Sequence, residues 1–327
     1  SAGYAPAPTF VPPVLGSRSM MLRTPLAEPV CRPSPSPVAW DDTPCPLCGR
    51  RDEEMVLEAD DANPGAGPVL RFAVVRCRQC GLTYTNPRPD EASIGRFYPA
   101  DYRPHRRPRK MREANSQTWW ERQTGRSSPE RSGDLPWVGA GRLLDFGCGG
   151  GSYLKRMADN GWRVTGLDAA VGAVRQVQEE LGLPALVGSL PHPDLRENSF
   201  DVVTMWHSIE HVHRPMDILR EAFKLLVPGG KLVVACPNIE SWAFRWFGPA
   251  WFALDLPRHL THFSPATLTQ MMTAAGFRVD SVKLIRHSDW MRSSAKLSVT
   301  RGGGGVFSRG LTWKPAAKAA ALATYAA

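Results

Sequence analysis

The feature that most constrains this chain is a glycine-rich turn after a short apolar strand, residues 143–151, with the sequence LLDFGCGGG. Glycines between a strand and a helix let backbone N–H groups approach a ligand that a Cβ atom would hold away. Asp145 stands immediately before the turn. Its carboxylate would repel a pyrophosphate at the helix N-terminus but would attract a cationic ammonium group. The turn therefore predicts a site for a ligand with an ammonium group rather than for a dinucleotide.

From residue 141 onward, apolar strand patterns alternate with helical patterns. Strands fit 141–146, 163–167, 184–187, 200–206 and 231–236, and helices fit 151–160, 170–181, 215–227 and 265–275. We also expect an edge strand at 277–285. This alternation predicts an α/β fold with a mostly parallel sheet covered on both faces. Right-handed crossovers then place the ligand at the carboxyl edge of the sheet, near the switch in strand order.

Four cysteines form two C-x₂-C pairs, Cys45 with Cys48 and Cys77 with Cys80, and a glycine follows each pair. Two such knuckles supply four thiolates for tetrahedral zinc. The 28 residues between the pairs exceed the usual ribbon spacing, and turn formers at 60–68 predict that the excess is a hairpin loop. Four protein thiolates leave the metal no open position, so the expected zinc is structural. Two disulfides or free thiols are the alternative.

The second strand also ends in a carboxylate, Asp168, which is placed to accept both hydroxyls of a ribose; capping of the next helix is the alternative. The third strand ends before Ser189, where an adenine edge could be held. Two further motifs follow, Phe200-Asp201 at the start of the fourth strand and the turn Pro228-Gly229-Gly230 before the fifth.

Residues 141–285 resemble the class I S-adenosylmethionine-dependent methyltransferases on these motifs taken together. The resemblance implies a doubly wound, mostly parallel, seven-stranded Rossmann-like sheet that binds S-adenosylmethionine across its carboxyl edge. It assigns the methionine moiety to Asp145, Gly147 and Gly149, the ribose to Asp168, and the adenine to Ser189 and Leu190. Trp206, at the end of the fourth strand, is a further cofactor-binding candidate.

Residues 42–102, including 82–89 and 97–102, look like the zinc-ribbon front end of a bacterial branch of this family, and 255–264 is similar to that branch as well. The branch is associated with modification of sugars, polysaccharides and natural products. We therefore expect a proline-rich disordered extension at 1–40, a zinc ribbon at 41–89, and a helical and basic linker region at 90–136. The methyltransferase domain follows at 137–290 with an acceptor-lid insertion at about 238–264, and the structure of the tail at 291–327 is left open.

Methyl transfer is an in-line displacement at a carbon that the sulfonium already activates, so positioning supplies much of the acceleration. A hydroxyl or carbon acid also needs a base, for which His is suited. His207 is the first candidate, and His211, His259 and His262 are others. In ubiquinone-biosynthesis O-methyltransferases, the similar stretch carries acidic and His residues that hold a divalent metal. Here His207 replaces the first carboxylate, which argues against a hard cation and favours capping and packing roles for Glu210 and His211.

Aromatic residues crowd the insertion: Trp242, Phe244, Trp246, Phe247, Trp251 and Phe252. Such side chains could close over a sugar ring or an apolar tail. They could equally form a dimer face or a patch that touches a membrane. The sequence leaves these alternatives open, and it does not predict an oligomeric state.

The chain carries a formal net charge of +9, with 43% hydrophobic and 22% charged residues. This composition is typical of a soluble globular protein, and no apolar run approaches the ~20 residues that span a bilayer. We see no secretory signal and expect a cytoplasmic protein. A basic cluster at 103–112 could hold a phosphate-bearing acceptor, RNA or an anionic membrane surface, or could be a solvated linker.

Three functions are compatible with this sequence. The first is methyl transfer to a small molecule such as a sugar, a glycan intermediate or a secondary metabolite. The second is an RNA methyltransferase that uses the ribbon to hold nucleic acid. Against it, the stretch after the fourth strand lacks the Asn/Asp-Pro-Pro-Tyr/Phe motif of many base methyltransferases. The third is a non-catalytic adaptor that retains the fold, against which the intact donor motif argues.

Overall fold

The computed structural model of the protein describes residues 38–61, 69–98, 135–285 and 287–300. The expectations for nearly all of the extension at 1–40, for the basic cluster at 103–112 and for the tail beyond residue 300 lie outside these residues.

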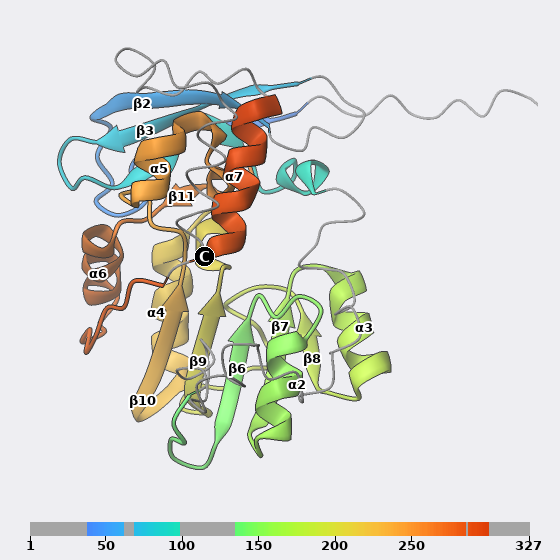
Figure 1. Ribbon diagram of the computed structural model, residues 1–327. Helices are drawn as coiled ribbons and strands as arrows, with labels where there is room; N and C mark the ends of the chain where they lie inside the picture. Colours follow the sequence, from blue (N-terminus) through green and yellow to red (C-terminus); the bar gives the residue numbers. More distant parts are fainter. Residues whose placement is uncertain (1–37, 62–68, 99–134, 286, 301–327) are drawn as a thin grey trace, which may run out of the picture. The chain divides into compact units, whose positions relative to one another are not determined.

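A five-stranded parallel sheet with the order β10-β9-β6-β7-β8 forms the centre of the α/β part. Its strands are β6 (Arg142–Phe146), β7 (Arg163–Asp168), β8 (Ala185–Val187), β9 (Phe200–Trp206) and β10 (Leu226–Ala235). The chain proceeds outward from β6 to β8 and then returns to β9 on the other side of β6 (Figure 1). The expected doubly wound class is confirmed, and the switch in strand order lies between β6 and β9.

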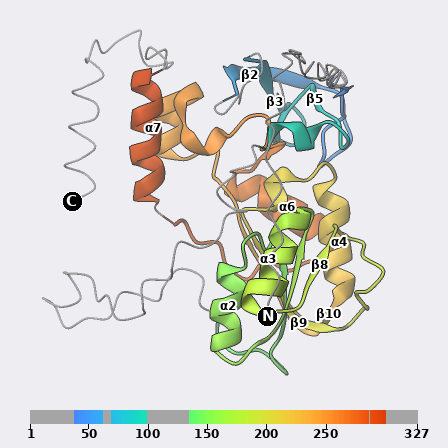
Figure 2. The same ribbon diagram turned by 90° about the vertical axis from the view of Figure 1, so that its right-hand side faces the viewer.

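Helices cover both faces of this sheet. They are α2 (Ser152–Asp159), α3 (Val171–Leu181), α4 (Pro215–Leu225) and α6 (Pro265–Ala274). Figures 1 and 2 show α2 and α3 on one face of the sheet and α4 on the other. In α4 the buried positions Ile218, Leu219, Ala222 and Leu225 recur at helical spacing, which is why this segment turns one apolar stripe toward the strands.

The expected count of seven strands is wrong for the described residues, and so is the edge strand at 277–285. No strand forms there, and every residue from 281 to 285 is exposed. Apolar side chains that would alternate between two faces of a sheet stay in contact with solvent; Leu284, for example, is 75% exposed. Alternation alone cannot make a strand, because a strand also needs a neighbour to pair with.

Asp201, at the start of β9, ties this strand to β6. Its Oδ2 accepts hydrogen bonds from the backbone N–H and the Nε of Arg142, both at 2.9 Å, and its Oδ1 accepts from Nη2 at 3.2 Å. These bonds lower the pKa of Asp201 to about 2. The Phe200-Asp201 motif thus has a structural role, since it joins the two strands at the switch in strand order.

The cysteine module forms a second sheet with the order β11-β4-β3-β2, in which all pairs are antiparallel. Its strands are β2 (Glu53–Asp60), β3 (Arg71–Cys77), β4 (Thr83–Thr85) and β11 (Thr261–His262). The last of these comes from the insertion, far along the chain. A separate pair joins β1 (Trp40–Asp41) to β5 (Arg88–Pro89). The ribbon and the α/β domain are therefore joined through a shared sheet.

Arg258, just before β11, reinforces this connection. Its side chain is fully buried and pairs with Asp61 after β2 and with Asp255 of the insertion, both at 2.8 Å. Nη1 also donates to the carbonyl oxygen of Phe97 at 2.7 Å. A buried guanidinium is tolerated because two carboxylates and main-chain carbonyl groups replace its hydration.

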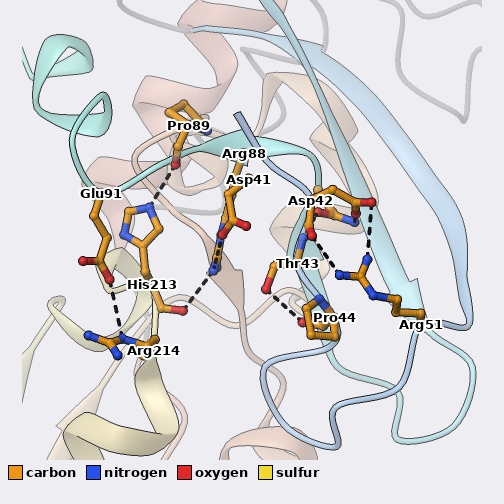
Figure 3. A network of polar contacts seen from close by, with 11 residues as sticks. Asp41, Asp42, Thr43, Pro44, Arg51, Arg88, Pro89, Glu91, His213 and Arg214 are labelled. Carbon is orange, nitrogen blue, oxygen red and sulfur yellow. Dashed lines mark hydrogen bonds and ion pairs between the residues drawn. The ribbon is translucent and has the colours of Figure 1, made fainter. Parts of the chain in front are cut away.

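A third contact region lies around Arg88 and His213 (Figure 3). Arg88 is 3% exposed, pairs with Asp41 at 3.2 Å and donates to the carbonyl oxygen of His213 at 3.1 Å. In return, Nε2 of His213 donates to the carbonyl oxygen of Pro89 at 2.9 Å. This reciprocal pair fastens the segment after η3 (Ile209–His211) to the end of the ribbon.

The aromatic insertion packs mostly into a core of its own with the ribbon. It contains α5 (Trp242–Phe247), η4 (Gly248–Ala250) and η5 (Phe252–Leu254), and buried Phe247 and Trp251 join Phe72 and Val74 of β3 in one cluster. A helix that the sequence did not predict, α7 (Ser288–Thr300), contributes Trp290 to the same cluster. Most of these aromatics therefore serve packing, and a lid role stays a proposal that concerns the exposed Trp242 and Phe252.

Two further findings concern the helices of the described residues. η1 (Ile94–Phe97) is the one helical segment described within the region expected to be a helical linker. Among the described residues, no helix combines the length and the apolar character that a membrane span requires.

We predict that Arg258→Ala destabilises the protein by about 3–5 kcal/mol, because it leaves the buried carboxylate of Asp61 without its cation. Chemical denaturation would measure this loss. The matched control is Arg51→Ala, which breaks an exposed ion pair with Asp42 and should cost less than about 1 kcal/mol. Equal losses in the two variants would contradict this role for Arg258.

Candidate functional site

The glycine turn after β6 is shaped by close packing against the segment after β9. Gly147 has a φ of 76° and donates its N–H to the carbonyl oxygen of Leu167 at 2.7 Å. A Cβ atom at this position would come within 2.5 Å of the Cβ of Ser208. Only glycine fits both the conformation and the space. The turn thus draws the ends of β6, β7 and β9 together at the carboxyl edge.

Asp145 is buried at this edge, with 2% of its surface exposed, and one of its oxygens accepts a hydrogen bond from Oγ1 of Thr204 at 2.7 Å. Burial raises the pKa of Asp145 to about 7, and the bond from Thr204 opposes this rise only in part. A cationic ligand nearby would lower the pKa again. The geometry therefore supplies a carboxylate whose charge a cation would stabilise.

Asp168, at the end of β7, is held by two backbone groups. Its Oδ2 accepts from the N–H of Gly149 and its Oδ1 from the N–H of Ala170, both at 2.8 Å. Each carboxylate oxygen has a second lone pair. The carboxylate is thus fixed in orientation and retains capacity for two hydroxyl donors, as a ribose would offer.

The loop after β8 lies beside this carboxylate, because Gly188 donates its N–H to the carbonyl oxygen of Asp168 at 2.9 Å. Ser189 is exposed, whereas Leu190 is 7% exposed and belongs to the main core. Trp206 is the last residue of β9, and its ring centroid lies 5.3 Å from that of Tyr153 on α2. Its Nε1 is buried and has no hydrogen-bond partner among the described residues.

His207 follows β9 in a backbone conformation that side chains rarely adopt, with a φ of 53°. Its N–H donates to the carbonyl oxygen of Ala235 at 2.8 Å, which continues the pairing of β9 with β10. The rings of His287 and Trp290 pack against its imidazole with centroids 5.9 and 5.1 Å away. Strain of this kind costs roughly 1–3 kcal/mol and is concentrated at functional sites.

Glu210 lies behind His207, and its Oε1 is 3.4 Å from Nδ1 of the imidazole. The carboxylate is 1% exposed, yet neither of its oxygens has a hydrogen-bond partner among the described residues. The expected helix-capping role of Glu210 is therefore wrong. His211 and His259 pack edge to face beside it, with ring centroids 4.6 Å apart, so the expected packing role of His211 agrees with the structure.

Tyr98, which is not among the site residues predicted from the sequence, also reaches this cluster. Its hydroxyl lies 3.1 Å from Nδ1 of His211. Only its position within the 97–102 motif, immediately after η1, could have drawn attention to it. The ribbon side of the chain thus contributes a polar group next to the end of β9.

His262 lies away from the cluster, inside the ribbon sheet. Oγ1 of Thr85 donates to the carbonyl oxygen of His259 at 2.9 Å and is 3.1 Å from Nε2 of His262. Since the hydroxyl proton of Thr85 already forms the bond to the carbonyl oxygen of His259, Nε2 of His262 must donate to Oγ1 of Thr85. Burial lowers the pKa of His262 to about 3, so its ring stays neutral. This environment indicates a structural rather than a catalytic role.

The two cysteine knuckles face each other. Sγ of Cys45 is 3.5 Å from Sγ of Cys80, Sγ of Cys48 is 3.5 Å from Sγ of Cys77, and all four sulfurs lie within 4.8 Å of one another. Sulfurs bound tetrahedrally to zinc at about 2.3 Å would lie roughly 3.8 Å apart. None of the four is in a disulfide. The donor set and spacing therefore fit structural zinc.

Comparison with known proteins adds to this geometry. A family model described as a methyltransferase domain matches residues 101–282. The ubiquinone biosynthesis O-methyltransferase of Xanthomonas euvesicatoria pv. vesicatoria is 34% identical over 169 residues, which cover 48% of this chain and 70% of that protein.

Solved structures are also similar in part. A methyltransferase from Thermotoga maritima, described as S-adenosylmethionine-dependent and as a possible histamine N-methyltransferase, is 25% identical with a TM-score of 0.39, covering 44% of this chain and 66% of that chain. A putative methyltransferase from Bacillus halodurans is 18% identical with a TM-score of 0.43, covering 50% and 79%.

S-adenosylmethionine is accordingly the cofactor of this chain. The fixed carboxylate of Asp168 and the buried carboxylate of Asp145 are consistent with a ribose and with a cationic amino acid moiety, respectively. The residue roles taken from the resemblance remain predictions, which substitution would test.

We predict that Asp145→Asn stabilises the donor-free protein as pH rises. Because the folded pKa of about 7 exceeds the ordinary carboxyl value of 3.8, the folded state binds more protons between those values, and the free energy of unfolding falls with pH. At about 1.4 kcal/mol per pH unit, the loss reaches roughly 4 kcal/mol at pH 8. Denaturation of both proteins from pH 4 to pH 8 should show the variant gaining over this window.

The control for that experiment is Asp201→Asn, whose effect has the opposite sign. The pKa of Asp201 is lowered by Arg142, so its stabilisation is present above the unfolded pKa and is lost as pH falls toward about 2. The control should therefore destabilise the protein at neutral pH. A difference between Asp145→Asn and the wild type that does not change with pH would contradict the proposed environment of Asp145.

We further predict that Cys45→Ser abolishes zinc binding by the ribbon and unfolds its sheet, since metal binding and folding are coupled in such modules. Elemental analysis and near-UV circular dichroism would measure both effects. Cys148→Ser is the matched control, because Cys148 is buried outside the knuckles. A Cys45→Ser protein with native dichroism and an unchanged ribbon zinc content would refute the assignment.

Proposed function

The chain belongs to the methyltransferase domain family, and we propose that it transfers a methyl group from S-adenosylmethionine to an oxygen atom of a small-molecule acceptor. The proposal is carried by one observation: a strained histidine, His207, follows β9 directly, beside the sheet edge where Asp145 and Asp168 lie. The likeness to an O-methyltransferase of ubiquinone biosynthesis supports oxygen as the acceptor atom.

The reaction is a displacement in which the acceptor oxygen attacks the methyl carbon and the sulfur leaves with the electron pair of the broken C–S bond. The donor loses its positive charge when the sulfur leaves, and this charge passes to the acceptor oxygen. The hydroxyl proton must therefore leave the acceptor to give a neutral product. His207 can accept this proton or hold the acceptor hydroxyl, because it directly follows Trp206 at the end of β9, next to the proposed donor site. His211 and His259, whose rings pack edge to face with centroids 4.6 Å apart, can orient the acceptor.

The acceptor class we propose is a sugar, a glycan intermediate or a secondary metabolite. The packing of the ribbon supports a small acceptor over RNA, because one edge of its sheet is covered by β11 and its β3 side chains are buried by the insertion. Because β11 and the insertion cover part of the ribbon, less of its surface is free to bind nucleic acid. The basic cluster at 103–112 lies outside the described residues and adds nothing to either alternative.

We expect His207→Ala to lower the rate of methyl transfer by about 10²–10⁴-fold, the usual contribution of a positioned acid or base. Donor affinity, measured by calorimetry, should change little. Asp168→Ala should show the reverse pattern and weaken donor binding severely. His262→Gln is the control for a buried histidine outside the site, and we expect it to affect stability more than transfer.

The experiment also separates the alternatives. Turnover that is unchanged in His207→Ala would show that this residue does not act in transfer. Absence of donor binding by the wild type at millimolar concentration would favour a non-catalytic adaptor. Methylation of RNA with a steep salt dependence, and of no small molecule, would favour the nucleic-acid alternative.

A further inference from the structure

The carboxylate of Glu210 is the least satisfied polar group near the site. It is 1% exposed, and neither oxygen has a hydrogen-bond partner among the described residues. Its Oε1 lies 3.4 Å from Nδ1 of His207, and that nitrogen also lacks a hydrogen bond among the described residues. Burying a carboxylate without hydrogen bonds is costly unless a cation compensates its charge. The position therefore calls for a positively charged partner.

Two histidines beside this carboxylate are held in one tautomer. Nδ1 of His211 lies 3.0 Å from the carbonyl oxygen of Arg258, and Nδ1 of His259 lies 2.9 Å from that of Ala253. A carbonyl oxygen can only accept, so Nδ1 carries the proton in both rings and Nε2 keeps its lone pair. Donation of one ring nitrogen to a backbone carbonyl is the usual support of a metal-ligating histidine.

The three side chains come from two segments that the fold binds together. Glu210 and His211 lie in η3, and His259 lies just before β11. The N–H of Leu260 donates to the carbonyl oxygen of Glu210 at 2.8 Å, which fastens one segment to the other. One donor atom from each of the three residues then lies within 4.8 Å of the others. Ligands bound tetrahedrally at about 2.1 Å lie roughly 3.4 Å apart, so modest closure would suffice.

We propose that Glu210, His211 and His259 bind one divalent transition-metal ion. From the sequence alone, the replacement of a carboxylate by His207 argues against a hard cation, and no local pattern connects His259 with this stretch. In the fold, His259 supplies the third ligand, and His207 is not required. Two imidazoles and one carboxylate select Zn²⁺, Fe²⁺, Mn²⁺ or Co²⁺ over Mg²⁺ or Ca²⁺, which prefer oxygen ligands.

This proposed site differs from the zinc site of the ribbon in the number of protein ligands. Four thiolates complete the coordination of zinc, whereas three protein ligands leave a position for water or another oxygen ligand. Assignment of that open position to the acceptor oxygen rests on the proposed function. Binding of the ion does not, and it can be tested without any acceptor.

The test is the metal content of the full chain. The protein is dialysed against excess Co²⁺ and then against metal-free buffer, and its metal is counted by elemental analysis. We expect two equivalents per chain in the wild type and one in His259→Gln and in Glu210→Gln. His262→Gln, in the same segment but bound to Thr85, should retain two. Near-UV circular dichroism would verify that each variant is folded.

Absorption spectra identify which ion is lost. Cobalt bound to the thiolates gives intense sulfur-to-metal charge-transfer bands, and cobalt bound to imidazole and carboxylate gives only the weaker ligand-field bands. His259→Gln should lose ligand-field intensity and keep the charge-transfer bands. Addition of Mg²⁺ in place of Co²⁺ should add no second equivalent.

A wild type that holds only the ribbon ion would overturn the proposal, whatever the variants do. Retention of both ions by folded His259→Gln would overturn it as well. If the variants do not fold, the number of equivalents and the spectrum of the wild type still decide the question. Loss of methyl transfer with two ions bound would count against the proposed function and not against this site.

Discussion

The antiparallel pairing of β11 with β4 is the constraint on which the rest of the molecule depends. Thr261 and His262, from the insertion after β10, extend the sheet that carries the cysteine knuckles. An antiparallel pair fixes the register of both strands, because a shift by one residue would exchange the buried and exposed side chains. The insertion is thereby held at the ribbon on one side and at β10 on the other.

This pairing determines where the polar groups of the candidate site lie. His259 stands two residues before β11, and its carbonyl oxygen accepts from Thr85 of β4. Arg258 reaches back to Asp61 beyond β2. The ribbon therefore holds the insertion in position, and the proposed acceptor site depends on this support. The donor side depends instead on the parallel sheet, where the ends of β6, β7 and β9 meet.

The two sides meet at the residues that follow β9. His207 continues the pairing with β10, whereas Glu210 and His211 turn into η3 and contact the insertion. One short segment thus belongs to the donor edge at its start and to the ribbon-supported region at its end. A site for methyl transfer needs both a held donor and a held acceptor, and this segment is where the fold can align them.

The sequence by itself determined the α/β class, the strands and helices of the donor half, and the four cysteine ligands. These features depend on local patterns: apolar runs of strand length, a glycine that tolerates a positive φ, and sulfurs held by a tight turn. Only the tertiary structure decided that His259 joins Glu210 and His211, that Tyr98 reaches the same cluster, and that His262 belongs to the ribbon sheet. These contacts join residues that are far apart in the chain. A local sequence pattern does not indicate which strand will pair with β11. The segment at 277–285 shows the same limit, because the sequence predicted an edge strand there and no partner strand is described beside it.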